Sequence, residues 1–305
     1  MYQRAFKYSP RINYKVSNWY WSNKYDGIRC YYSHTKDSLC YRTGTVIPRL
    51  EHILESCREI CEQDDLSLLD GELWVPGLKF REISSLVRGQ KKITDEQKQQ
   101  IKLALFAARK PILGNEYNTS HQSDFTTPDM INYLDTIDYQ KHNSLVKVTY
   151  GTVNNSQVAI DEVARQEQDN GWEGIVLRNP STSYIGGGTH TLLKRVIPKE
   201  AIYKITGFNE GNGRYAGMLG SFNYEGEAID EDRNNILVEG KVSSGLKIKQ
   251  RVDVWADKDK YLGVAIKLRY QKVNSPDEDG KGALRFPRLL EIIQNCQLVK
   301  ADELI

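Results

Sequence analysis

The segment WSNKYDGIRC, residues 21 to 30, places a lysine between bulky aromatic residues and a tight Asp-Gly turn. An ordinary lysine has a pKa of about 10.4 and is almost fully protonated near neutral pH, so a nucleophilic lysine needs burial or neighbouring cations. The aromatic residues and Arg29 would supply both to Lys24. Gly27 lets the backbone approach a ligand closely, and the arginine can hold a phosphate or a ribose. A surface lysine beside a hairpin turn would also give this string.

Residues able to bind a phosphorylated ligand follow in order along the chain. LDGELW places two carboxylates on a strand-like segment, ALFAA offers an aromatic stacking face, and WEGIVLR brings a third carboxylate to the start of a strand. TLLK then ends in a lysine, and LRFPRL supplies two arginines near the C-terminus. In order, these side chains are Asp70, Glu72, Phe106, Glu173, Lys194, Arg285 and Arg288. The ordered set makes the nucleophilic interpretation of the lysine much stronger than its own segment does.

The composition is that of a soluble globular protein with room for two domains. The 305 residues are 39% hydrophobic and 27% charged, and the formal net charge is +2. Residues 1 to 50 carry nine Lys or Arg and two Asp, a net charge of +7, which suits contact with a phosphate backbone, although a solvated basic face would look similar. There is no apolar run long enough for a membrane span and no secretory leader, so we expect a cytoplasmic protein, in the host cytoplasm if it is viral.

The chain divides into two parts that differ in pattern. Residues 20 to 110 alternate strand-like runs with amphipathic helices at 49 to 63 and 80 to 88, which predicts a mixed α+β domain. In the first of these helices Cys57 and Cys61 follow an apolar stripe, which favours packing over metal binding. Residues 111 to 143 are polar and turn-rich and indicate a peripheral insertion, with a short helix after Pro128 that carries Met130, Ile131, Leu134 and Ile137 inward. Another helix near 156 to 169 precedes the strand GIVLRNP. Beyond Pro198, short strands at close spacing predict a small closed or partly closed β-barrel.

Taken together, the motifs resemble those of the covalent nucleotidyltransferase superfamily and, within it, ATP-dependent DNA ligases of the small, phage-like type. The resemblance spans nearly the whole chain, including FNEGNGRYAGMLGSF, VSSGLKIKQR and GVAIKLRYQKV in the second part. It implies a nucleotidyltransferase (adenylation) domain over 1–198, with the antiparallel sheets of an ATP-grasp-like ligase, and an OB-fold domain over 199–305. The fold class is therefore expected to be α+β in two domains.

The resemblance implies a role for each residue of the first group. Lys24 would attack the α-phosphorus of ATP to give lysyl-AMP and release pyrophosphate. Arg29 would hold the ribose or the nick phosphate, and Glu72 would accept hydrogen bonds from the ribose hydroxyls. Phe106 would stack on adenine, although a core aromatic on a buried strand is the alternative. Lys194 would neutralise the α-phosphate in the transition state.

The remaining implied roles concern the metal, the DNA and the departing pyrophosphate. Glu173, with Glu72 nearby, would help to bind Mg²⁺ or Mn²⁺, since these hard cations take few carboxylates beside phosphate oxygens and water. Arg42, in YRTG, resembles the arginine that grips the nick 5′-phosphate. Arg285 and Arg288 would clamp the β- and γ-phosphates from the second domain, which must close for adenylation and swing away for DNA.

Three positions depart from the family pattern. Ala107 follows the stacking phenylalanine where an aspartate is usual. The second lysine of a Lys-x-Lys pair is missing after Lys194, which leaves Arg195, Lys199 and Lys204 as candidates for a second phosphate-binding cation. At the nucleotide-binding position two residues before the nucleophile, where an acid often reads the adenine amino group, the chain has Ser22. Adenine specificity would then depend on backbone atoms.

The predicted function is that of an ATP-dependent DNA ligase, which seals 3′-hydroxyl/5′-phosphate nicks in duplex DNA. We expect the protein to be a monomer that does not associate with membranes. An ATP-dependent RNA ligase and a GTP-dependent mRNA capping enzyme share the lysine chemistry and are the alternatives. The OB-fold sequence and RFPR favour the DNA ligase. An NAD-dependent ligase is disfavoured because its zinc-binding cysteines have no counterpart. A nucleic-acid-binding module without activity would be expected to have lost Lys24 or its partners.

Overall fold

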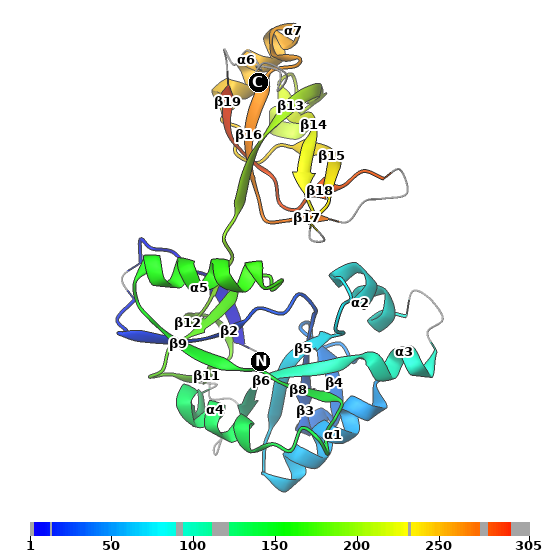
Figure 1. Cartoon of the computed structure of the whole chain (residues 1–305), viewed down its shortest axis with the longest axis vertical. Helices are drawn as coiled ribbons and strands as arrows, with labels where there is room; N and C mark the ends of the chain where they lie inside the picture. Colours follow the sequence, from blue (N-terminus) through cyan, green and yellow to red (C-terminus); the bar gives the residue numbers. More distant parts are fainter. Residues whose placement is uncertain are drawn as a thin grey trace, which may run out of the picture. The chain divides into compact units, whose positions relative to one another are not determined.

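The computed structural model describes residues 3–12, 14–89, 94–111, 122–230, 233–274 and 280–293. The chain forms two compact units, Met1–Val196 and Ile197–Ile305, each with its own hydrophobic core (Figure 1). Both contain helices and sheets, so the predicted α+β class is confirmed. None of the helices in the described ranges is both long enough and apolar enough to cross a membrane.

The first unit contains two five-stranded sheets. One has the order β1-β12-β10-β2-β9, with the strands β1 (Gln3–Lys7), β12 (Gly187–Arg195), β10 (Ile175–Arg178), β2 (Asn18–Asn23) and β9 (Tyr150–Asn154). The other has the order β4-β3-β5-β6-β8, with the strands β4 (Ser38–Tyr41), β3 (Ile28–Ser33), β5 (Leu68–Trp74), β6 (Lys102–Arg109) and β8 (Leu145–Lys147). A small separate pair is formed by β11 (Ser183–Ile185) and β7 (Gln122–Thr126).

The sheets are not wholly antiparallel, which corrects the prediction. The edge strand β1 runs parallel to β12, and β8 runs parallel to β6. More than thirty residues connect β6 to β8, and a parallel pair needs such a long crossover instead of a tight turn. The other pairs in these two sheets are antiparallel.

The Asp-Gly turn of the lysine segment joins the two sheets. The strand β2 before it belongs to the first sheet and β3 after it belongs to the second. The alternative of a hairpin turn is therefore wrong, because hairpin strands pair with each other. A Cβ at Gly27 would lie 2.1 Å from the Leu73 carbonyl oxygen, so only glycine fits at this crossing.

Helices pack against the sheets through the faces that their apolar residues predict. They are α1 (Glu51–Gln63), α2 (Phe80–Val87), α3 (Asp95–Gln100), α4 (Thr127–Thr136) and α5 (Gln157–Asp169), and a 3₁₀ turn, η1, covers His34–Lys36. In α1, which contacts β3 and β5, Ile53, Cys57, Ile60 and Cys61 are buried, and the cysteines are free thiols. The expectation that these cysteines pack in the core is confirmed.

The segment 111 to 143 is not a peripheral insertion in the part that is described. Helix α4 begins at the predicted place, with Pro128 in its first turn and Thr126 as its cap. Met130, Ile131 and Leu134 are buried in the main core, and the helix contacts β6. The inward face of this helix was predicted from its helical spacing, and only the peripheral position of the segment is wrong.

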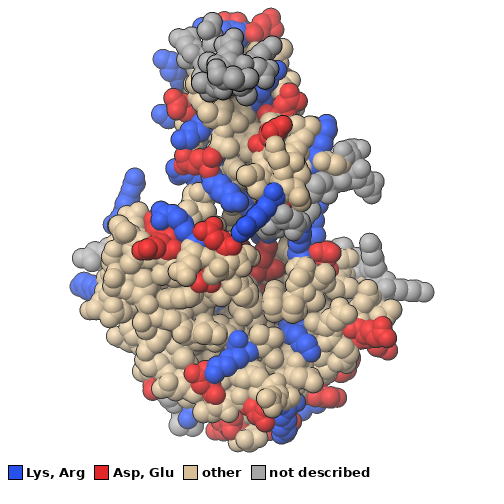
Figure 2. Space-filling view, viewed as in Figure 1, with Lys and Arg blue, Asp and Glu red and all other residues tan. Residues whose placement is uncertain are grey.

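The second unit is built on a five-stranded sheet with the order β15-β14-β13-β16-β19. Its elements are β13 (Lys199–Glu210), η2 (Gly213–Tyr215), β14 (Leu219–Ile229), β15 (Asn235–Val242), α6 (Ile248–Ala256), α7 (Lys258–Tyr261), β16 (Ala265–Tyr270), β17 (Val273–Asn274), β18 (Ala283–Leu284) and β19 (Arg288–Ile293). Figure 2 shows acidic and basic side chains interspersed over this unit, where Lys267 and Arg269 pair with Glu200.

A closed barrel is not found among the described residues of this unit. The edge strands β15 and β19 do not pair with each other, and a single parallel bridge, Val238 to Gly282, links β15 to the β17–β18 hairpin. The bridge leaves the ladder of hydrogen bonds incomplete on that side, whereas a closed barrel needs a continuous ladder. The helices α6 and α7, which the sequence analysis did not predict, lie between β15 and β16 in the chain.

Candidate active site

A cavity of about 220 Å³ in the first unit collects most of the predicted site residues. Both five-stranded sheets contribute to its wall. Seven predicted residues line it: Ser22, Lys24, Arg29, Arg42, Glu72, Phe106 and Lys194. Eight further lining residues were not predicted: Gln3, Arg4, Ala5, Asn23, Tyr25, Val176, Arg178 and Leu192.

Lys24 and Glu173 are held together at the end of the first sheet. The Lys24 amide donates to the Gly174 carbonyl (2.8 Å), and the Glu173 amide donates to the Lys24 carbonyl (3.3 Å). These backbone bonds continue the pairing of β2 with β10 and bring the two side chains into an ion pair. The Glu173 side chain is only 7% exposed and that of Lys24 is 22% exposed. A carboxylate therefore fixes the lysine ammonium at the rim of the cavity.

An aromatic group flanks this ion pair, but its members differ from those expected. Tyr25 follows the lysine and packs edge-on against Trp74 and Trp172, with ring centroids 5.3 and 4.9 Å apart. Trp19, by contrast, is buried in the sheet, and Trp21 lies against Gly151. Residues in a strand alternate between its two faces, which explains why neighbours in sequence do not all surround the lysine.

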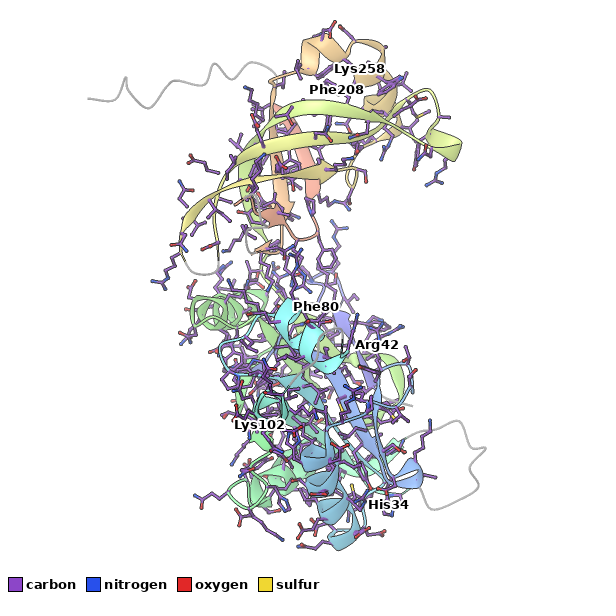
Figure 3. The ribbon with its side chains drawn as sticks, turned by 90° about the vertical axis from the view of Figure 1, so that its right-hand side faces the viewer. His34, Arg42, Phe80, Lys102, Phe208 and Lys258 are labelled. Atoms are coloured by element: carbon purple, nitrogen blue, oxygen red, sulfur yellow. The ribbon has the colours of Figure 1, made fainter. Side chains whose placement is uncertain are left out.

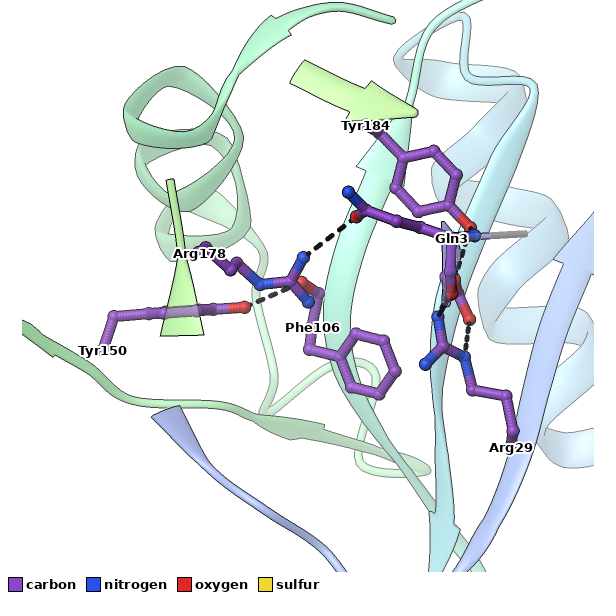
Figure 4. A network of polar contacts seen from close by, with 7 residues as sticks. Gln3, Arg29, Phe106, Tyr150, Arg178 and Tyr184 are labelled. Carbon is purple, nitrogen blue, oxygen red and sulfur yellow. Dashed lines mark hydrogen bonds and ion pairs between the residues drawn. The ribbon is translucent and has the colours of Figure 1, made fainter. Parts of the chain in front are cut away.

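Arg29 is anchored by a buried carboxylate behind the cavity (Figure 4). Its Nε donates to Asp70 Oδ1 (2.6 Å), Nη2 donates to Oδ2, and the same Nη2 donates to the Gln3 carbonyl (3.1 Å). The Tyr184 hydroxyl also donates to Asp70, while accepting from the Gln3 amide (2.9 Å). Asp70 is fully buried, so this network fixes the guanidinium rigidly.

Phe106 lies beside two arginines. The guanidinium carbon of Arg29 is 4.4 Å from the ring centroid and that of Arg178 is 5.5 Å from it. The Tyr150 hydroxyl donates to the Phe106 carbonyl (2.7 Å), which holds this part of β6 against the first sheet. The ring is partly exposed to the cavity, although it also packs on the core. Phe106 therefore adds an aromatic surface to the cavity wall, which is the kind of group that stacks on a base.

Glu72 has an unusual acidity for a carboxylate. It lies opposite Arg29 in the pairing of β3 with β5 and faces the cavity. Burial raises the pKa of Glu72 to about 7, although the nearby charges of Arg29 and Lys24 oppose that rise. The protonated and ionised forms of such a carboxyl group are both populated near neutral pH. Small changes in its surroundings therefore change the fraction that is ionised.

The neighbouring residues Lys194 and Arg195 lie on opposite faces of β12. Leu192 and Lys194 line the cavity, whereas Arg195 points to the other face and forms a two-pronged ion pair with Asp161 of α5 (2.6 and 2.8 Å). Arg195 is therefore structural in this structure. Arg4 of β1 lines the cavity on the same sheet and was not considered as a phosphate-binding cation.

The arginines assigned to the DNA and to the pyrophosphate lie in different places. Arg42 is exposed in the turn after β4, at the cavity rim, and is labelled in Figure 3. Arg285 and Arg288 belong to the second unit together with Lys199 and Lys204. Arg288 is exposed at the start of β19, and the Arg285 guanidinium carbon lies 5.4 Å from the ring of Phe286.

Glu72 lines the cavity, and Glu173 is paired with Lys24 at its rim, in positions that suit a cation brought by a nucleotide. Within the described ranges, no cluster of three or more His, Cys, Asp or Glu side chains is arranged to hold a metal ion. Glu72 and Glu173 interact electrostatically with each other and with Lys24. Mg²⁺ commonly uses one or two carboxylates together with phosphate oxygens and water, so this donor set fits it.

Several residues of the site could not be found from their motifs. Gln3 and Tyr184 are 181 residues apart and meet because β1 pairs in parallel with β12, which directly follows β11 in the chain. Arg178 had a usable signal, because it follows Val176 by two residues and therefore lies on the same face of β10.

Comparison with known proteins gives sequence relatives of one kind. No family model matches the chain. A DNA ligase of Natronomonas pharaonis is 29% identical over 191 residues, which are 56% of this chain and 34% of that protein. DNA ligase 2 of Methanosarcina acetivorans is 26% identical over 162 residues, which are 47% of this chain and 28% of that protein. The matches therefore span about a third of the length of these relatives.

Solved structures share the fold over nearly the whole chain. A structure from a study of Lig E DNA ligases as minimal DNA-binding scaffolds has a TM-score of 0.67 at 22% identity and covers 96% of this chain and 98% of that one. The ATP-dependent DNA ligase of bacteriophage T7, in complex with ATP, has a TM-score of 0.57 at 18% identity, covering 95% and 98%. The predicted resemblance to ATP-dependent DNA ligases is thereby confirmed: the chain is similar to DNA ligases in sequence and to ATP-dependent DNA ligases in fold.

Proposed function

We propose that this protein is an ATP-dependent DNA ligase that seals nicks in duplex DNA through a lysyl-AMP intermediate. The observation that carries the proposal is the arrangement around Lys24, which is fixed beside Glu173 at the rim of a cavity lined by Glu72, Phe106 and Lys194. The cavity combines an aromatic face, a carboxylate and cations. These are the groups needed by a base, a ribose and a phosphate respectively.

In the first step, Lys24 Nζ attacks the α-phosphorus of ATP. A nitrogen–phosphorus bond forms, the bond from the α-phosphorus to the bridging oxygen breaks, and pyrophosphate leaves. The attacking amine must lose a proton, and the adjacent Glu173 carboxylate is placed to accept it. Lys194 faces the same cavity and would balance the negative charge on the α-phosphate.

In the later steps, after pyrophosphate has left, the nicked DNA reacts with the lysyl-AMP. An oxygen of the nick 5′-phosphate attacks the phosphorus of lysyl-AMP, the nitrogen–phosphorus bond breaks, and Lys24 leaves as the amine, which gives a 5′-adenylated end. The 3′-hydroxyl then attacks the 5′-phosphorus of the nick and loses its proton to solvent, a phosphodiester bond forms, and AMP leaves. Arg42 would bind the nick 5′-phosphate from the rim, and Arg29 would bind ribose or phosphate from its fixed position. Positioning and charge neutralisation dominate each step.

Glu173 and Glu72 would hold a divalent cation delivered with ATP, either Mg²⁺ or Mn²⁺. When bound, the cation would neutralise phosphate charge. Glu72 therefore has two compatible tasks, as a ligand of the cation and as an acceptor for ribose hydroxyls. Binding the cation needs its ionised form, which is also the stronger hydrogen-bond acceptor.

We further propose that residues 1–198 are the adenylation domain and that 199–305 are an OB-fold domain. Arg285 and Arg288 of the second domain would clamp the β- and γ-phosphates during adenylation. We expect the protein to act as a monomer in the cytoplasm, with nicked duplex DNA as its partner.

Labelling with α-labelled nucleotides tests the proposal. The protein is incubated with labelled ATP or GTP and separated by denaturing electrophoresis. Covalent label from ATP that is lost in Lys24→Ala, but kept in the surface variant Lys98→Ala, would support a ligase. Label from GTP alone would indicate a capping enzyme, and nick sealing confined to RNA strands would indicate an RNA ligase. No label from either nucleotide would overturn the proposal.

A further inference from the structure

Strand register shows which end of the cavity would take the base. Lys24 directly follows β2 and lies four residues beyond Tyr20, a separation of roughly 13 Å along an extended chain. Tyr20 pairs with Arg178 of β10, so Arg178 lies at the level farthest from the lysine. The α-phosphorus must approach Lys24, and in a nucleotide the base is at the opposite end from the phosphate. Arg178 therefore lies at the base end.

The walls at this end suit a flat ring. Phe106 comes from one sheet, whereas Val176 and Leu192 come from the other, and all three line the cavity. An aromatic face and aliphatic side chains provide apolar surfaces for the two faces of a purine. They give affinity for a ring but no selection among bases, because every base has similar faces.

Two buried polar side chains stand at the same end. Gln3 is 4% exposed and Arg178 is 5% exposed, and both line the cavity. Arg178 Nη1 is 3.4 Å from Gln3 Oε1, which makes this a long hydrogen bond (Figure 4). Arg178 Nε has no hydrogen-bond partner within the described residues. A buried guanidinium left with incomplete hydrogen bonding is costly unless a ligand completes it.

We propose that Gln3 and Arg178 read the edge of the adenine base. Gln3 Oε1 accepts from the exocyclic amino group, and an N–H of Arg178 donates to the ring nitrogen beside that group. Adenine presents this donor and acceptor side by side, whereas guanine carries an oxygen in place of the amino group and would face the Gln3 oxygen with a second acceptor. The pair thus takes over the task that the acid usually found at the position of Ser22 would perform.

This inference rests on the proposed function and is tested through the adenylation rate. The probes are ATP and purine riboside triphosphate, which lacks the amino group. Gln3→Leu removes the acceptor but keeps the backbone bonds of Gln3 to Arg29 and Tyr184. In the unchanged protein we expect kcat/KM to fall about 10- to 100-fold when the amino group is absent. In Gln3→Leu we expect the two nucleotides to differ by less than about 3-fold.

Arg178 is tested with the ring-nitrogen analogues 1-deaza-ATP and 7-deaza-ATP. One of them should be adenylated poorly by the unchanged protein, and this penalty should disappear in Arg178→Met. Arg165→Gln, an exposed arginine on α5, is the matched control and should keep every penalty. If Arg178→Met does not fold, as judged by thermal unfolding, Arg178→Lys replaces it and should weaken the same penalty.

The outcomes separate this inference from the proposed function. A protein that is labelled by ATP, but whose variants show the same analogue penalties as the unchanged protein, would overturn the base-reading pair and leave the ligase intact. An equal loss of rate with every nucleotide would show that the two residues are only structural. A protein that no nucleotide labels would overturn both.

Discussion

At the residue scale, the buried ion pair of Arg29 and Asp70 is the part of the site whose substitution should destabilise the fold most. Asp70 is fully buried and accepts hydrogen bonds from Arg29 and Tyr184. In Asp70→Asn the guanidinium would lose its counter-charge inside the protein. We expect the free energy of unfolding, measured by urea denaturation, to fall by about 3 kcal/mol or more. Adenylation should also fall, because Arg29 would no longer be fixed.

The exposed pair of Arg58 and Asp37 is the matched comparison for this prediction. It has the same two-pronged geometry, at 2.8 and 2.9 Å, but Asp37 is 54% exposed. Asp37→Asn should cost less than about 1 kcal/mol. Equal losses in the two variants would show that burial does not govern the role of Asp70.

The acidity of Glu72 predicts how stability depends on pH. Its pKa in the folded protein is about 7, against an ordinary value of 4.5. The folded protein therefore keeps this proton at pH values where the unfolded chain has released it. The free energy of unfolding should decline as pH rises from about 5 to about 7.5 and then level off. Glu72→Gln should remove this component of the decline in urea unfolding measured across that range.

ATP binding should change with pH in the opposite direction. The ionised carboxylate is the form that binds a cation and the stronger acceptor for ribose hydroxyls, so affinity for ATP should rise between about pH 6 and pH 8. An affinity that is flat across this range in the unchanged protein, or that varies equally in Glu72→Gln, would exclude Glu72 from nucleotide binding.

At the element scale, the backbone between Glu173 and β10 positions the catalytic pair. Gly174 has a φ of +149°, and an added Cβ would lie 2.4 Å from the Arg195 carbonyl oxygen. Its own carbonyl accepts the Lys24 amide. We expect Gly174→Ala to lower the free energy of unfolding by about 2 kcal/mol or more and to slow adenylation sharply, as measured by the rate of covalent labelling.

Gly171 separates backbone strain from steric overlap. It also has a positive φ, of +95°, but no atom lies within 4 Å of an added Cβ. Gly171→Ala should therefore cost about 1 kcal/mol and leave adenylation nearly unchanged. If both alanines slow adenylation equally, the close approach at Gly174 is not what holds Lys24.

The same elements show what the sequence could predict and what it could not. Apolar spacing predicted α1, α2 and α5 well, because a helix needs only local periodicity to be recognised. The motif order predicted seven of the residues that line the cavity. The sequence could not show that β2 and β3 belong to different sheets or that β1 supplies Gln3, since strand pairing depends on contacts between distant segments. The inward face of α4 was predicted, but its place in the main core was not, because the polar flanks indicated a peripheral insertion.

At the scale of the whole molecule, the second unit was predicted less fully. Its strands were found from their spacing, but α6, α7 and the open order of the sheet were not. Short strands have the same alternation in open and closed sheets, so closure depends on how the edge strands meet. The roles of Arg285 and Arg288 remain predictions.

Arg288 provides a test of cooperation between the two units. If it only orients pyrophosphate, Arg288→Ala should slow adenylation by about 10²- to 10³-fold and largely spare the sealing of a pre-adenylated nick. Arg269→Ala changes the residue opposite it on β16, which is already paired with Glu200, and should affect neither step. Single-turnover rates measure both steps. Equal losses in the two steps for Arg288→Ala would indicate a role in folding or DNA binding.

The central claim is that Lys24 carries AMP, and one paired measurement with Lys24→Ala tests it most directly. The variant is assayed for covalent AMP with labelled ATP and for sealing of a nick that already carries a 5′-adenylate. The account predicts no covalent AMP, together with sealing of the pre-adenylated nick within about tenfold of the unchanged protein, because the nucleophile has then completed its task. Covalent AMP that persists in Lys24→Ala would contradict it.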